Sequence, residues 1–91
     1  MKILHLTLKK KWFDMILSCE KKEEYRELKP YWDSRLLFRK YDIIRFRNGY
    51  SKNAPTFDIE FKGVKLDNAK PEWSDNAKGM FYVIKLGKIL N

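Results

Sequence analysis

The sequence predicts a small α+β domain built on a mixed β-barrel of about five strands, with two short helices. Its 91 residues leave room for one hydrophobic core. Several segments alternate between apolar and polar residues, which is typical of half-buried strands, and two segments have helical spacing instead. We therefore expect a single domain spanning residues 1–91.

The chain opens with a predicted strand over residues 2–8. Its alternation places three leucines on the face that we expect to be buried, namely Leu4, Leu6 and Leu8. The opposite face carries His5, the single histidine of the chain. A lone strand histidine is more often a surface or packing residue than a catalytic base, so we expect a structural role for it.

A short helix is predicted next, over residues 9–17. Its apolar side chains share one face, which we expect to cover one end of the barrel: Trp12, Phe13, Ile16 and Leu17. Cys19 follows at the position where glycine usually ends a helix, because the backbone there is often left-handed. A residue other than glycine costs about 1 kcal/mol at such a position.

The next two elements concentrate charge. Residues 21–28 alternate like a strand, yet they carry charge on both faces. Either this strand is a solvated edge or one of its faces lines a polar groove. Pro30 then allows a short helix or lid over residues 29–38, with Trp32, Leu36 and also Phe38 directed towards the body.

Three further strands complete the expected barrel. The strand over residues 41–46 directs Ile44 and Phe46 inwards and places Arg45 and Arg47 on the other face. The apolar positions that begin at Phe57 change parity after Gly63, which predicts a β-bulge at a barrel corner. The most apolar run, residues 80–86, predicts a central strand that ends at Gly87 and leaves residues 88–91 as a tail. Whether the polar connection over residues 67–79 folds over a site is left open.

Composition limits the partners. The net charge of +8, from 20 basic and 12 acidic residues, makes a polyanion the first partner to consider. The 15 lysines and five arginines favour plain solubility instead, because specific phosphate contacts prefer the planar arginine side chain. Charge alone therefore supports both interpretations about equally.

Other classes of protein are disfavoured. No apolar run approaches the roughly 20 residues that cross a bilayer, and the lysine-rich start is unlike a signal peptide. One cysteine cannot form an internal disulfide, and one cysteine with one histidine cannot build a structural zinc site. We expect a soluble, cytoplasmic protein with no cofactor, no metal and no membrane partner.

The segment over residues 18–26 carries a motif. The spacing of Lys21, Glu24 and Arg26 resembles the G-x-K-x-x-E-x-R signature of the ASCH family, with Cys19 in place of the glycine. ASCH proteins are small domains with a PUA-like β-barrel and are often linked to RNA. The resemblance implies a PUA-like barrel here, with the first helix packed near its mouth.

These three residues also suggest a site on their own chemistry. Glu24 and Arg26 lie two apart on a strand and share a face, which Lys21 can reach from the preceding turn. A carboxylate between two cations stays ionised and orients the guanidinium, which suits a nucleotide with its phosphate and exocyclic amines. The alternative is an ordinary surface ion pair worth under about 1 kcal/mol.

Residues beyond the motif extend the expected ligand-binding surface. Four aromatic residues could provide stacking: Tyr25, Tyr31, Trp32 and Tyr50. Three arginines could enlarge the positive surface: Arg35, Arg45 and Arg47. For Arg45 and Arg47, a solvated strand face explains the pattern equally well.

Binding of RNA or a nucleotide is the first expectation for function. The second is a small hydrolase of modified nucleosides or of RNA, with Lys21 and Glu24 as catalytic residues. Some ASCH-like proteins hydrolyse acylated cytidines with the motif lysine, a threonine three places later and a distant glutamate. Here Glu24 stands in the place of that threonine, which disfavours this reaction. An accessory protein-interaction domain is the third interpretation.

Overall fold

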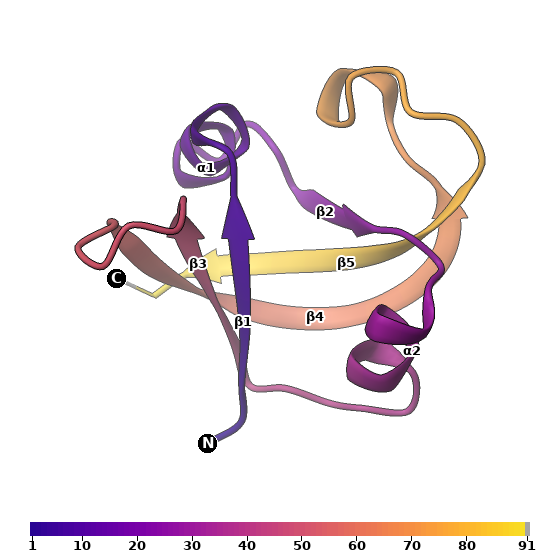
Figure 1. Ribbon diagram of the computed structural model, residues 1–91, viewed down its shortest axis with the longest axis horizontal. Coiled ribbons are helices and arrows are strands. Elements are labelled where there is room, and N and C mark those ends of the chain that lie inside the picture. Colours follow the sequence, from indigo (N-terminus) through magenta and orange to yellow (C-terminus); the bar gives the residue numbers. More distant parts are fainter. Residues whose placement is uncertain (91) are drawn as a thin grey trace.

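The computed structural model describes residues 1–90, which form five strands, two α-helices and one 3₁₀ turn (Figure 1). In chain order they are β1 (Ile3–Leu8), α1 (Lys10–Leu17), β2 (Glu23–Arg26), α2 (Pro30–Leu36), β3 (Ile43–Asn48), β4 (Thr56–Asn68), η1 (Pro71–Trp73) and β5 (Met80–Ile89). The predicted α+β class, with five strands and two helices, is confirmed.

The five strands form one mixed sheet in the order β1-β3-β4-β5-β2. β1 runs parallel to β3, and the other neighbouring pairs are antiparallel. Among the described residues, β1 and β2 are therefore the two edges of the sheet and do not pair with each other. The expectation of a closed barrel was wrong, because the sheet is curved but stays open.

The curvature is concentrated in β4, the long bent strand of Figure 1. Its first part, from Thr56 to Glu60, pairs with β3, and its part from Ile59 onwards pairs with β5. The register with β5 shifts on both sides of Phe61. Gly63 follows with a φ of +111°, a backbone conformation that favours glycine. The bulge predicted from the change of parity is confirmed.

The core lies between the concave face of the sheet and the two helices. It is built from the predicted apolar faces, including Leu4, Leu6, Leu8, Phe13, Ile16, Leu36, Ile44, Phe46, Phe57, Ile59, Tyr82 and Ile84. α1 docks through Phe13, whose ring meets Phe57 edge to face at 5.0 Å. Leu17 and Phe38 were wrongly expected in the core. Both are exposed, because Leu17 is the last residue of α1 and Phe38 lies beyond the end of α2.

β5 does not stop at Gly87 as the sequence suggested; it continues to Ile89. A Cβ at Gly87 would lie 2.9 Å from the Cβ of Glu60 in β4. The glycine therefore allows close contact between two paired strands and does not end the strand. The predicted tail is part of β5 up to Ile89, and its last residue, Asn91, lies outside the described residues.

Candidate functional site

The site begins where α1 ends. Cys19 adopts the left-handed backbone expected for this position, with a φ of +68°. Its N–H donates to the carbonyl of Ile16 at 3.0 Å, and the N–H of Glu20 donates to the carbonyl of Met15 at 2.9 Å. These two bonds form a Schellman motif, which satisfies the last carbonyls of the helix and reverses the chain. The reversal brings Lys21 back beneath α1.

The three motif residues converge in the interior. The Lys21 Nζ atom lies 3.0 Å from Oε1 of Glu24, and Nη1 of Arg26 donates to the other carboxylate oxygen. The side chains of Lys21, Glu24 and Arg26 are only 1%, 5% and 16% exposed. We call these three residues the buried ion cluster. They are not the ordinary surface ion pair that was the alternative.

Arg26 also connects the two edges of the sheet. Its Nη2 atom donates to the backbone carbonyl of Thr7 in β1, at 3.2 Å. Because Arg26 belongs to β2, a side chain makes the contact that backbone pairing would make in a closed barrel. Figure 1 shows the carboxyl end of β1 just below α1, with β2 to its right. The sheet stays open at this seam, where the side chains of the cluster lie between its edges.

Burial determines the electrostatics of Lys21. Loss of water around the ammonium group lowers the pKa of Lys21, and the neighbouring Glu24 carboxylate opposes this effect. The Nζ atom also lies 4.6 Å from the ring centre of Tyr25 and 5.2 Å from that of Trp12. Aromatic faces thus replace part of the lost hydration. Lys21, whose side chain is almost fully buried, holds the Glu24 carboxylate from the interior side.

Arg26 keeps one hydrogen-bond donor unused. Its guanidinium carbon lies 5.1 Å from the centre of the Trp32 ring. Its Nε atom is buried, and no other atom of residues 1–90 accepts a hydrogen bond from it. A buried donor without an acceptor costs about 1–3 kcal/mol.

A cavity of about 690 Å³ opens beside the cluster. Glu24 and Arg26 form a polar part of its wall, and five aromatic side chains line the rest: Trp12, Tyr25, Tyr50, Trp73 and Phe81. Ligand sites of roughly 300–1,000 Å³ are typical of proteins, so the cavity can hold one nucleotide. A flat aromatic group would find several rings to stack on.

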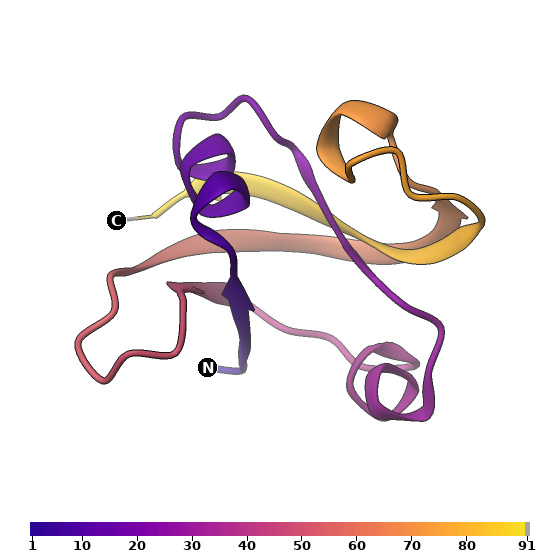
Figure 2. The ribbon, with the colours of Figure 1, turned by 45° about the horizontal axis from the view of Figure 1, so that its top comes forward.

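The connection between β4 and β5 forms one side of this cavity, through Trp73, Ser74, Asp75 and Ala77. An ion pair of 2.5 Å between Lys11 and Asp75 ties it to α1, and the backbone N–H of Lys70 donates to the Tyr25 hydroxyl. Figure 2 shows η1 on the same side of the sheet as α1. The connection is thus a wall of the cavity, which the sequence had left open.

The other predicted ligand-binding residues are more scattered. Tyr50 is 90% exposed and lines the cavity. Tyr31 and Arg35 lie together on α2, with the guanidinium carbon 3.6 Å from the ring centre, and neither lines this cavity.

Arg45 and Arg47 lie away from the cluster, on the other face of β3. Arg45 makes a bidentate pair with Asp58, at 2.7 and 2.9 Å, and Arg47 donates to the carbonyl of Ser51. Both guanidinium groups therefore already have partners within the protein. The hydrogen bonds from Arg45 hold the pKa of Asp58 below its usual range. Neither arginine joins the cavity wall.

Sequence reasoning missed several wall residues. Trp12 was expected to pack against the core, and Trp73 and Phe81 were not named as site residues. Thr7 contributes its backbone carbonyl, which no sequence pattern reveals. The one available signal was the presence of Trp73 in a polar connection without regular period, because a large aromatic residue there needs something to pack against.

Comparisons with protein-family models, curated proteins and solved structures found no match for this chain. Within residues 1–90, no three histidine, cysteine, aspartate or glutamate side chains gather in a way that could hold a metal ion. Neither α-helix of this part of the chain has the length and apolar character needed to cross a membrane.

Proposed function

We propose that this protein binds RNA or a nucleotide in the cavity beside the buried ion cluster, as an ASCH-like domain with a PUA-like fold. One observation carries the proposal: a carboxylate and a guanidinium, fixed by a buried lysine and by β1, form the polar part of an aromatic-walled cavity. The open seam between β1 and β2 leaves space for the ligand at the position where the ASCH-like motif lies.

The wall chemistry suits a nucleobase. Stacking on an aromatic side chain contributes about 1–3 kcal/mol per base. An ionised carboxylate has about four acceptor positions, so Glu24 can accept from an exocyclic amine while it keeps Lys21 and Arg26. The side chain of Glu24 is 5% exposed and is held by both cations, which fixes the direction in which it accepts.

Cationic residues near the cavity suit the phosphate. Lys9 is exposed and lines the cavity, and the chain as a whole carries a net charge of +8. A positive surface attracts a polyanion from a distance and releases its counterions on contact. Asp75 in the cavity wall is already paired with Lys11, so Lys9 can meet the phosphate beside the site for the base.

Fluorescence anisotropy with a short unstructured RNA tests this proposal. Arg26→Ala should weaken binding by about tenfold or more, since a charged hydrogen bond is worth about 1.5–3 kcal/mol. Arg39→Ala is the matched control, because it removes the same charge from a surface beside Lys2 and Lys40. Equal losses in the two variants, each shown to be folded by circular dichroism, would contradict the proposal.

A hydrolase is the second candidate, supported by the lowered pKa of Lys21 beside Glu24. A lysine with a lowered pKa can act as a general base. Its near-complete burial disfavours this role, because the base must reach the proton it removes. Incubation with acylated cytidines and small RNAs decides the matter: turnover that Lys21→Met abolishes would support hydrolysis, and no turnover would leave binding.

A further inference from the structure

We infer that the site takes two adjacent nucleotides of a single strand, the second in a neighbouring cavity. This inference rests on the proposed function and makes it more specific, because it selects a strand over a free nucleotide as the ligand. It follows from the position, the walls and the charges of the second cavity.

The second cavity adjoins the first. It has a volume of about 570 Å³ and lies between β1 and the start of α2. Three residues line both cavities: Thr7, Arg26 and Tyr50. Because Arg26 and Thr7 form the contact across the seam, the two cavities lie on either side of that contact. Each has a volume typical of a ligand site and can hold one nucleotide.

The walls of the second cavity provide stacking surfaces. Tyr31 is 57% exposed and Tyr50 is 90% exposed, although both are large aromatic side chains. Trp32 lies between Tyr31 and Arg26, with its ring centre 4.8 Å from that of Tyr31. An exposed aromatic side chain gains by covering its ring, and a base can stack on any such ring regardless of sequence. This cavity therefore suits the base of a neighbouring nucleotide.

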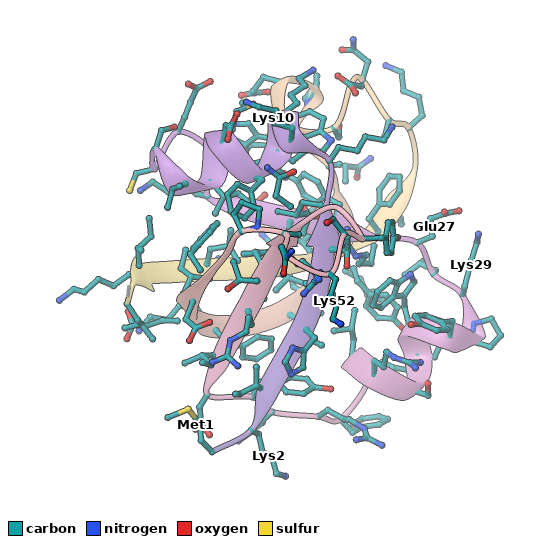
Figure 3. All side chains as sticks on the ribbon, turned by 60° about the vertical axis from the view of Figure 1, so that its left-hand side comes forward. Met1, Lys2, Lys10, Glu27, Lys29 and Lys52 are labelled. Carbon is teal, nitrogen blue, oxygen red and sulfur yellow. The ribbon has the colours of Figure 1, made fainter. Side chains whose placement is uncertain are left out.

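A weakly paired cation lies beside the second cavity, where the linking phosphate would pass. Lys29 lines the second cavity and forms a 3.3 Å ion pair with Glu27, in which both side chains are exposed. Figure 3 shows both side chains projecting from the connection between β2 and α2. An exposed pair of this kind is worth under about 1 kcal/mol, so Lys29 can exchange Glu27 for a phosphate at small cost. Arg26 lines both cavities, but its guanidinium is held by Glu24 and Thr7, so Lys29 is the cation that would meet the phosphate.

The three tryptophans of the chain report the two cavities separately. Trp12 and Trp73 line the first cavity, and Trp32 lines the second. In ¹H–¹⁵N spectra, a ribonucleoside monophosphate should shift the indole signals of Trp12 and Trp73. A diribonucleotide should also shift the Trp32 indole signal and bind about tenfold tighter, because one additional base stacks.

Two variants complete the experiment. Tyr31→Ala should reduce the affinity for the diribonucleotide to that for the monophosphate and leave monophosphate binding unchanged. Phe38→Ala is the matched control, since Phe38 is fully exposed and lines neither cavity, and it should change neither affinity.

The two proposals fail in different ways. Equal affinity for the two ligands, with a Trp32 signal that does not move, would overturn the second nucleotide site while the first remains. Signals of Trp12 and Trp73 that stay fixed with both ligands would overturn the proposed function, and this inference with it.

Discussion

Glu24 is the residue on which the interior charges depend. It neutralises Lys21 on one carboxylate oxygen and Arg26 on the other, and all three side chains are largely removed from water. The spacing of the motif predicted that these side chains would meet. It could not predict their burial, because a strand with charge on both faces can equally be solvated. Burial results from Trp12 and Tyr25, whose rings enclose Lys21.

Neutral substitutions at two members of the buried ion cluster should lower the free energy of unfolding by unequal amounts. Glu24→Gln leaves two cations without their shared carboxylate and should lower the free energy of unfolding by about 3 kcal/mol. Lys21→Met should cost clearly less, because Glu24 keeps Arg26 and the methionine fills a buried space. Urea unfolding of both variants measures this difference, and equal costs would show that Glu24 is not the shared partner.

The backbone of Cys19 is strained. Its φ of +68° is unfavourable for a residue with a Cβ, so Cys19→Gly should stabilise the protein by about 1 kcal/mol. Ser18→Gly is the control, because Ser18 has a right-handed helical backbone with a φ of −81° and gains nothing from glycine. Thermal unfolding measures the stability of both variants relative to the wild type. A Cys19→Gly variant less stable than the wild type would show that the Cys19 backbone is not strained.

At the scale of elements, the predicted faces were largely correct and the element ends were less so. Alternation correctly predicted the inward faces of β1, β3 and the first part of β4, but it missed Ile43 and Asp58, which are buried on the other face. It could not show that β5 passes through Gly87, because glycine ends a strand in some settings and allows close packing in others. It also gave no position for the connection that contains η1, which has no repeating pattern and is held by single contacts such as Lys11–Asp75.

The attachment of α2 to β5 should depend on pH. The Tyr82 hydroxyl donates to Asp33 in α2, and this bond is the main cause that raises the pKa of Tyr82 from 10.0 to about 12. A raised pKa of this kind adds stability that is complete below pH 10 and is lost as the pH rises towards 12.

Tyr82→Phe should therefore be less stable than the wild type at pH 8, and the difference should shrink as the pH rises above 10. Urea unfolding at several pH values from about 8 to about 11.5 measures this stability difference as the pH approaches the raised pKa of Tyr82. Tyr50→Phe is the control, because Tyr50 is 90% exposed. A difference that stays constant with pH would rule out the hydrogen bond as its cause.

At the scale of the whole molecule, the sheet is open where a closed barrel was expected. The period of a strand gives its two faces but not its neighbours, so the sequence could not show that β1 and β2 remain unpaired. The contact from Arg26 to Thr7 replaces that pairing and lies between the two cavities. The open seam between β1 and β2, which the sequence did not predict, is therefore where the candidate site lies.

Because the molecule carries a net charge of +8, salt should weaken its binding to a nucleic-acid strand. If a bound strand places two phosphates against cations, the logarithm of the affinity should fall with the logarithm of the salt concentration with a slope of about −1.4. Lys29→Ala should reduce this slope by about 0.7, because it removes one phosphate contact. Titrations in increasing salt measure both values, and a slope near zero would show that phosphate is not recognised.

We expect a nucleobase to enter the cavity beside the buried ion cluster. Intermolecular nuclear Overhauser effects between a bound oligoribonucleotide and the protein test for this entry. We predict effects from base protons to the rings of Trp12, Tyr25 and Phe81, which line the cavity. Effects confined to Phe38 and the neighbouring surface, with none to these three rings, would contradict it.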